Sequence, residues 1–183
     1  GLRIGGGGFG RVYRADAERL PLSRLPPQLR HLPLAVKRAR SGVSGGLFKM
    51  QSEARLLTRC SHPHLLPLLG YCLSEEAPCL VSPLMRGGSL GARLRPAEME
   101  VAQLGLLGLT PPLKPLTWRQ RLRIMCEAIE ALVYLHSLPS LHRDFKPDNI
   151  LLDERLNAYL ADTGFAKDQR PDASGRSKSN VMY

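Results

Sequence analysis

The stretch that decides the interpretation of this sequence is His142-Arg143-Asp144-Phe145-Lys146-Pro147-Asp148-Asn149, followed thirteen residues after Asn149 by Asp162-Thr163-Gly164. Between the two, residues 150–152 and 158–161 are apolar and are separated by the polar turn 153–155, which predicts two short strands. The polar runs therefore precede and follow a predicted hairpin, and they present acids, a lysine and an amide in a defined order.

A glycine-rich segment lies near the beginning of the chain. Gly5-x-Gly7-x-Phe9-Gly10-x-Val12 falls inside a hairpin predicted over residues 2–14. Glycine lets backbone N–H groups approach phosphate oxygens and accepts the positive φ of tight turns. Taken alone, a plain glycine-rich hairpin explains the segment equally well.

Two charged side chains follow this segment. Ala35-Val36-Lys37 places a lysine at the end of a short apolar strand, and Glu53 lies on a helix predicted over residues 47–59 from its apolar spacing. The ordinary interpretations are a surface lysine and a solvated glutamate. An ion pair between them therefore depends on the rest of the sequence.

The order of these motifs resembles the signature of the eukaryotic protein kinase family. That signature consists of a glycine-rich loop, a strand lysine, a helix glutamate, a His-Arg-Asp-x-x-x-x-Asn run and an Asp-Phe-Gly triplet, the last of which reads Asp-Thr-Gly here. Lys146, two residues after Asp144, is the serine/threonine form of that loop. Further segments resemble the receptor-like, Pelle and interleukin-receptor-associated group of serine/threonine kinases: HPHLLPLLGYC at 62–72, GGSL at 87–90, LTWRQRLRIMCEAIEALVYLH at 116–136 and NILLDERLNAYLADTGFAK at 149–167.

The resemblance implies an α+β, protein-kinase-like fold with two lobes: a small antiparallel sheet with one helix, and an incomplete, mainly helical lobe. The helix from Trp118 to about His136 is predicted from the spacing of Leu122, Met125, Ile129 and Leu132. The implied boundaries are a small lobe at 1–82 with a Pro/Arg-rich insertion at 16–33, a hinge at 83–88, and a partial large lobe at 89–183, with the catalytic loop at 142–149 and a truncated activation segment at 162–183.

The resemblance also implies ATP and Mg²⁺ as ligands. Asp144 would accept the proton of a substrate hydroxyl, Lys146 would neutralise the γ-phosphoryl group, and Glu53 would steady a phosphate-binding lysine. The implied ATP-binding residues are Ile4, Gly5, Gly6, Gly7, Gly8, Phe9, Gly10, Val12, Ala35, Lys37 and Met85; the catalytic residues are Lys37, Glu53, Asp144 and Lys146; the metal ligands are Asn149 and Asp162.

Three departures from the family pattern stand out. The usual phenylalanine of Asp-Phe-Gly is Thr163, so we expect a less stable active alignment. The hinge reads Ser82-Pro83-Leu84-Met85; because Pro83 lacks an N–H, nucleotide contacts fall to Met85 N–H and to carbonyls, and Ser82 leaves a roomy back pocket. Finally, the chain begins inside the first predicted strand and stops at Tyr183 before any Ala-Pro-Glu motif. We therefore expect a fragment truncated at both ends.

Composition narrows the class of protein. The 183 residues carry 26 basic and 16 acidic side chains, a formal net charge of +10, and residues 1–60 hold 12 of the basic and 3 of the acidic ones. This uneven distribution and the lack of a basic motif interleaved with aromatics argue against a nucleic-acid binder. The four cysteines form no metal-binding pattern and are expected to be reduced and mostly buried. No apolar run is long enough to span a membrane, which favours a cytoplasmic segment of a parent that is either soluble or linked to a receptor.

The predicted function is transfer of the ATP γ-phosphoryl group to serine or threonine hydroxyls of a protein substrate. The alternative is a pseudokinase or scaffold that binds nucleotide or a partner without turnover, motivated by Thr163 and by the missing C-terminal part.

Overall fold

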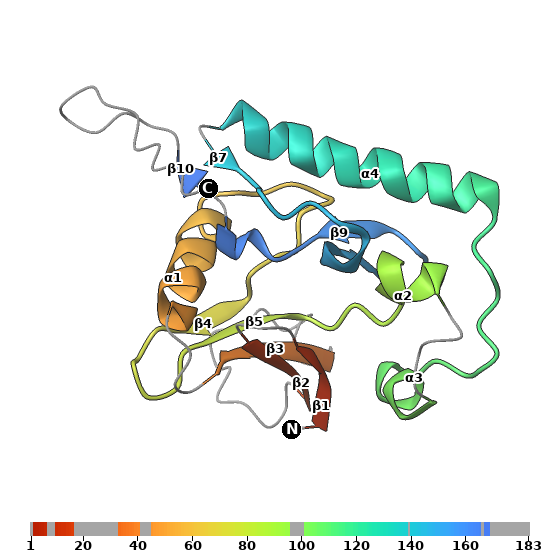
Figure 1. The fold of residues 1–183 in the computed structure, drawn as a ribbon, viewed down its shortest axis with the longest axis horizontal. Helices are drawn as coiled ribbons and strands as arrows, with labels where there is room; N and C mark the ends of the chain where they lie inside the picture. The colour runs from red at the N-terminus through yellow and green to blue at the C-terminus, as the bar shows by residue number, and fades with distance from the viewer. Residues whose placement is uncertain are drawn as a thin grey trace.

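A five-stranded antiparallel sheet forms one end of the protein (Figure 1). The computed structural model describes residues 2–6, 10–16, 33–40, 45–95, 101–138, 140–165 and 167–168. The strand order is β1-β2-β3-β5-β4, and every neighbouring pair is antiparallel. The strands are β1 (Leu2–Gly6), β2 (Gly10–Asp16), β3 (Pro33–Ala39), β4 (Gly70–Cys72) and β5 (Cys79–Pro83). The hairpin and the strand around Lys37 are found as predicted.

The helix α1 (Gly46–Leu57) packs beside this sheet, as predicted for residues 47–59. Met50 and Ala54 share a small core with Leu80 of β5. Glu53 follows Met50 by three residues and therefore lies on the same buried face of the helix. The helix thus carries one carboxylate toward the sheet.

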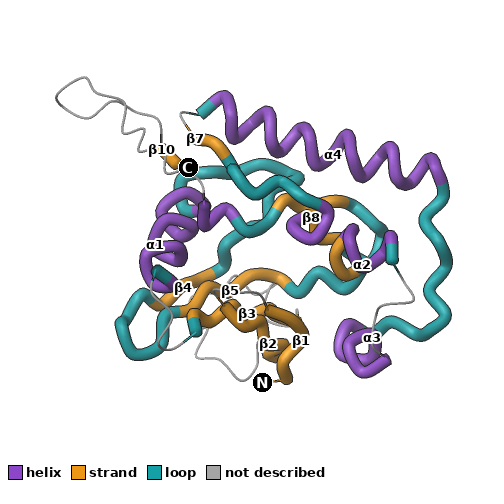
Figure 2. The backbone as a smooth tube through the Cα atoms, viewed as in Figure 1, coloured by secondary structure: helices purple, strands orange, loops and turns teal. Residues whose placement is uncertain are grey.

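The second layer combines a short sheet with the long helix α4 (Trp118–Ser137), which Figure 2 shows crossing the far side of the molecule from β1–β5. The small sheet has the order β6-β8-β9. Its strands are β6 (Gly88–Ser89), β8 (Ile150–Leu152) and β9 (Ala158–Leu160); β7 (Ser140–Leu141) pairs with β10 (Lys167–Asp168), and α2 (Leu90–Leu94) follows β6. The main core joins α4 to β8 and β9.

The buried face of α4 is not the one marked by the apolar residues from which the helix was predicted. The buried residues are Ile124, Ala128, Ala131 and Leu135, whereas Leu122, Met125 and Ile129 are 40–49% exposed. The small alanines allow α4 to lie close to β9. The helix begins with a capping box, in which Thr117 and Gln120 satisfy each other's backbone N–H groups.

The helix α3 (Val101–Leu107) was not predicted from the sequence. The helix is held by tertiary hydrogen bonds: the Arg14 guanidinium donates to the Leu106 carbonyl at 2.8 Å, and Arg86 Nε donates to the Leu107 carbonyl at 3.2 Å. Neither bond can be read from local sequence, which explains why the helix was missed. Most of the Pro/Arg-rich insertion at 16–33 lies outside the described residues; Asp16 ends β2 and Pro33 begins β3.

All four cysteines are free thiols. The expectation that they are mostly buried is wrong, because Cys72 and Cys126 are exposed and Cys60 and Cys79 are half-buried. Among the described helices, none has the length and apolar character that a membrane crossing requires.

Candidate active site

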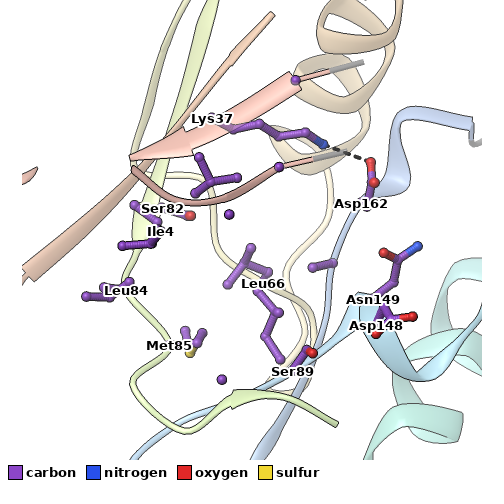
Figure 3. A pocket seen from close by; sticks show the side chains of 18 of the residues that line it. Ile4, Lys37, Leu66, Ser82, Leu84, Met85, Ser89, Asp148, Asn149 and Asp162 are labelled. Atoms are coloured by element: carbon purple, nitrogen blue, oxygen red, sulfur yellow. Dashed lines mark hydrogen bonds and ion pairs between the residues drawn. The ribbon is translucent and has the colours of Figure 1, made fainter. Parts of the chain in front are cut away.

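A cavity of about 810 Å³ lies between the five-stranded sheet and the second layer (Figure 3). Nearly all of the site residues predicted from the sequence line this cavity. The predicted residues that line it are Ile4, Gly5, Gly6, Gly10, Val12, Ala35, Lys37, Glu53, Met85, Asp144, Lys146, Asn149 and Asp162. The remaining predicted residues, Gly7, Gly8 and Phe9, lie outside the described part of the chain.

Lys37 of β3 is the charged centre of this cavity. Its Nζ lies 2.7 Å from Glu53 Oε2 on α1 and 2.8 Å from Asp162 Oδ1 after β9. Burial alone lowers the pKa of the Lys37 ammonium, but the two carboxylates outweigh it and raise the pKa above its ordinary value. Lys37 is therefore a fixed cation at neutral pH, held in place by two segments that are distant in sequence.

Glu53 is only 4% exposed, which is rare for a carboxylate and requires partners. Besides Lys37, the backbone N–H of Thr163 donates to it. This bond uses the peptide group of residue 163, so it survives the replacement of phenylalanine by threonine. The Thr163 side chain is itself fully buried, and its Oγ1 has no hydrogen-bond partner among the described residues.

Asp144 forms the second charged centre. Lys146 Nζ donates to both of its oxygens, at 3.0 and 2.8 Å, and Asn149 Nδ2 donates to its Oδ2 at 2.9 Å. Partial burial by itself raises the pKa of Asp144, but these hydrogen bonds outweigh it and lower the pKa below its ordinary value. The carboxylate is therefore ionised at neutral pH and able to accept a further hydrogen bond.

His142 attaches this loop to the strand layer. Its ring is 1% exposed; one nitrogen, Nε2, lies 3.0 Å from the Ala161 carbonyl, and the other, Nδ1, accepts from the Asp144 N–H at 3.3 Å. Burial lowers the pKa of His142, in agreement with a neutral ring that donates from Nε2 and accepts at Nδ1. Arg143 and Asp162, on either side of this contact, have φ values of 65° and 58°, a strained conformation that is frequent at functional sites.

Asn149 and Asp162 fit a hard divalent cation by their chemistry. The Ala161 N–H donates to the Asn149 carbonyl at 2.8 Å, which brings Asn149 beside the residue that precedes Asp162. Both side chains line the cavity, and they offer amide and carboxylate oxygens, the donors that Mg²⁺ accepts. No cluster of three or more His, Cys, Asp or Glu suited to a metal occurs within the described ranges, so any bound ion needs oxygens from its substrate or from water.

The glycine-rich turn and the segment 82–85 form the rest of the cavity wall. A Cβ on Gly10 would meet the Arg38 carbonyl oxygen at 3.0 Å, so this position tolerates little beyond glycine. Ser82 and Pro83 end β5 opposite Ala35 and Leu34, and the next N–H, that of Leu84, donates to the Pro33 carbonyl at 2.9 Å.

Several lining residues were not predicted from the sequence. They are Lys49, Met50, Leu66, Ser89, Ala92, Leu107, Asp148 and Leu151. Asp148 could have been predicted as a site residue, since it lies within the run His142–Asn149. Lys49 and Met50 could also have been predicted, because they precede Glu53 by one turn of the same helix. Leu66 and Leu107 could not, because only the tertiary fold brings their segments to the cavity.

One cavity thus contains a half-buried lysine held between two acids and a carboxylate held by a lysine and an amide. The order of these groups along the chain is that of the protein kinase signature. The chain belongs to the family described as protein tyrosine and serine/threonine kinase, whose sequence model matches residues 1–182. The predicted family and the α+β kinase-like fold are thus confirmed.

Proteins of Arabidopsis thaliana are similar to this chain. Wall-associated receptor kinase-like 20 is 36% identical over 167 residues, which is 90% of this chain and 22% of that protein. Probable serine/threonine-protein kinase PBL9 is also 36% identical over 167 residues, covering 90% of this chain and 38% of that protein. U-box domain-containing protein 51 is 37% identical over 179 residues, covering 96% of this chain and 20% of that protein. The chain therefore spans well under half the length of these relatives.

Proposed function

We propose that this chain is the catalytic part of an ATP-dependent protein kinase that transfers the γ-phosphoryl group of ATP to serine or threonine hydroxyls. The observation that supports this most strongly is that the Asp144 carboxylate lines the same cavity as the Lys37 ammonium. Phosphoryl transfer requires a group that positions the acceptor hydroxyl and cations that hold the phosphates, and the carboxylate and the lysines of this cavity are suited to these roles. The names of the similar kinases agree with serine or threonine as acceptor.

The apolar side chains Ile4, Val12 and Ala35 line one wall and are suited to an adenine ring. The glycine-rich turn from Gly5 to Gly10, including Gly7, Gly8 and Phe9, would cover the phosphates with backbone N–H groups. Met85 would contact the base through its backbone. Lys37, aligned by Glu53, would bind the α- and β-phosphates.

Asn149 and Asp162 would hold Mg²⁺. When bound, the ion supplies charge neutralisation between the phosphates. The Asp162 carboxylate accepts a hydrogen bond from Lys37 Nζ at 2.8 Å, so its position is already set by the same lysine that would bind the phosphates.

In the transfer step, the acceptor oxygen forms a bond to the γ-phosphorus while the bond from that phosphorus to the β,γ-bridging oxygen breaks, and ADP leaves. The proton of the acceptor hydroxyl passes to Asp144, which its hydrogen bonds keep ionised beforehand. Lys146, bound to the same carboxylate, would neutralise charge on the transferred group.

We further propose that residues 1–82 and 89–183 act as the two lobes, joined by a hinge at 83–88. Protein substrates would reach the cavity at the Asp144 side. The kinase segment would act in the cytoplasm, with the protein either soluble or attached to a membrane receptor.

The experiment is phosphate incorporation from labelled ATP and Mg²⁺ by the full-length protein, with myelin basic protein as a general acceptor. Asp144→Ala should lower incorporation by about 10²-fold or more, because the acceptor loses its proton-accepting group. Glu130→Ala is the matched control: it removes a 64% exposed carboxylate on α4 and should leave incorporation unchanged. Equal rates for wild type and Asp144→Ala would overturn the proposal, as would phosphate found on tyrosine alone.

A pseudokinase is the second candidate, and it is favoured by Thr163, which stands where the family has phenylalanine. The Thr163 hydroxyl is buried and has no hydrogen-bond partner among the described residues. In that case the full-length protein would bind ATP in a fluorescence titration, with Lys37→Ala weakening the binding, while incorporation stays at background. Measuring both binding and incorporation on the same preparation separates the two functions.

A further inference from the structure

Two cysteines face each other across neighbouring strands at the outer edge of the five-stranded sheet. Cys72 ends β4, Cys79 begins β5, and the antiparallel register pairs the two residues directly. Directly opposed residues of an antiparallel pair have Cα atoms about 4.5–5.5 Å apart and side chains on the same face. A disulfide needs Cα atoms about 4.4–6.8 Å apart, so the backbone is already placed for one.

Neither cysteine forms a disulfide in the structure, and the two side chains differ in solvent exposure. Cys72 is exposed and Cys79 is half-buried. Cys72 Sγ lies 3.4 Å from Ser74 Oγ, and this hydrogen bond lowers the pKa of the Cys72 thiol. Burial raises the pKa of the Cys79 thiol above its ordinary value. The pair therefore joins an accessible, more acidic thiol to a protected one.

The other two cysteines are arranged differently. Cys60 follows the C-terminal end of α1, and Cys126 lies within α4; neither is paired with a cysteine in a strand register. They provide internal controls for thiol reactivity, since Cys126, like Cys72, is exposed and Cys60, like Cys79, is half-buried.

We propose that Cys72 and Cys79 are a redox site that closes into a reversible intramolecular disulfide when the protein meets a hydroperoxide. The Cys72 thiolate attacks the terminal peroxide oxygen, the O–O bond breaks, and the leaving oxygen takes a proton to give water or an alcohol. The Cys79 thiolate then attacks the sulfur of the resulting sulfenic acid. The S–S bond forms, and the hydroxyl of the sulfenic acid leaves as water after protonation.

In this sequence two thiols are oxidised and one hydroperoxide is reduced, so no further electron acceptor is needed. A small dithiol reverses the reaction by exchange. The site is separate from the cavity that contains Lys37 and Asp144, because neither cysteine lines that cavity.

The test treats the full chain with a small excess of hydrogen peroxide, blocks the remaining thiols by alkylation, and digests the protein without reduction. A glutamyl endopeptidase cuts after Glu75 and Glu76, which lie between the two cysteines, so a Cys72–Cys79 bond leaves two peptides joined. We expect these joined peptides to appear with peroxide and to separate with dithiothreitol, while Cys126 stays alkylated.

Cys72→Ser and Cys79→Ser should each abolish the joined peptides, and Cys60→Ser should retain them. The Cys60 variant is necessary because Cys60 and Cys72 share one peptide after this digestion. The proposal is overturned if Cys72 and Cys79 stay as alkylatable as Cys126, if the joined peptides are lost in Cys60→Ser, or if the bond links two chains.

Discussion

The ammonium of Lys37 and the carboxylate of Asp162 are in contact at 2.8 Å although 125 residues separate them in the chain. Lys37 lies on the sheet of the first layer and Asp162 follows β9 of the second, so this pair connects the two walls of the cavity. The same ammonium contacts Glu53 of α1 at 2.7 Å. One side chain thus sets the relative position of three elements at the site.

Replacing Lys37 should destabilise the fold as well as the site. Lys37→Met leaves Glu53, which is 4% exposed, without its countercharge, and we expect the free energy of unfolding to fall by about 1–3 kcal/mol. This is less than for a fully buried pair because 27% of the Lys37 side chain is exposed. Chemical denaturation measures the change. Adding Glu53→Gln should recover part of the loss, and a double variant that is no more stable than Lys37→Met alone would contradict the argument.

The low pKa of Asp144 predicts a pH-dependent contribution to stability. A carboxyl whose folded pKa lies below its unfolded value of about 3.8 stabilises the fold above that value and loses this contribution as the pH falls through the folded pKa. The difference in unfolding free energy between wild type and Asp144→Ala should therefore be largest near neutral pH and should narrow below about pH 4. Denaturation at a series of pH values measures it, and a difference that grows in acid would reverse the assigned sign.

Thr163 offers a direct test of the buried hydroxyl. Because its Oγ1 lacks a partner among the described residues, Thr163→Val removes a desolvated polar group at nearly constant shape. We expect the free energy of unfolding to rise by about 1 kcal/mol. Thr163→Phe forces a ring into a fully buried position and should lower it by about 1–3 kcal/mol, measured by thermal or chemical denaturation. Destabilisation by valine would show that the hydroxyl is satisfied.

Leu107 links the helix α3 to the cavity. Its side chain lines the cavity, so Leu107→Ala removes apolar contact and should raise the Kd for nucleotide by about 3–10-fold. Leu106→Ala is the matched control, since Leu106 lies on the same helix without lining the cavity and its carbonyl still accepts from Arg14. Titration of a fluorescent ATP analogue compares the two variants. Equal affinities would remove α3 from the nucleotide site.

Local features of the sequence were sufficient to predict the strands and helix that carry the motifs. The glycine-rich hairpin, the strand of Lys37, the helix of Glu53 and the strands around 150–160 are found where the sequence predicted them. Each depends on short-range features: turn residues, alternation in strands, or helical spacing with a cap. Motif order was sufficient to name many of the residues that line the cavity, including Lys37, Glu53, Asp144 and Asp162.

Long-range contacts were beyond the reach of these signals. The spacing of Leu122, Met125 and Ile129 suggested the apolar face of α4, yet the helix buries Ile124 and Ala128 instead, because β9 lies on that side. The helix α3 depends on hydrogen bonds from Arg14 and Arg86, which are distant in sequence.

The sequence by itself therefore determined the family, the order of the elements and most of the charged groups that line the cavity. Only the tertiary structure decided how those groups are charged and paired: that Lys37 contacts two carboxylates, that Asp144 is bound by Lys146 and Asn149, and that Cys72 faces Cys79. The physical reason is that burial, hydrogen bonds and strand register set pKa and reactivity. These depend on neighbours in space, which no local run of residues specifies.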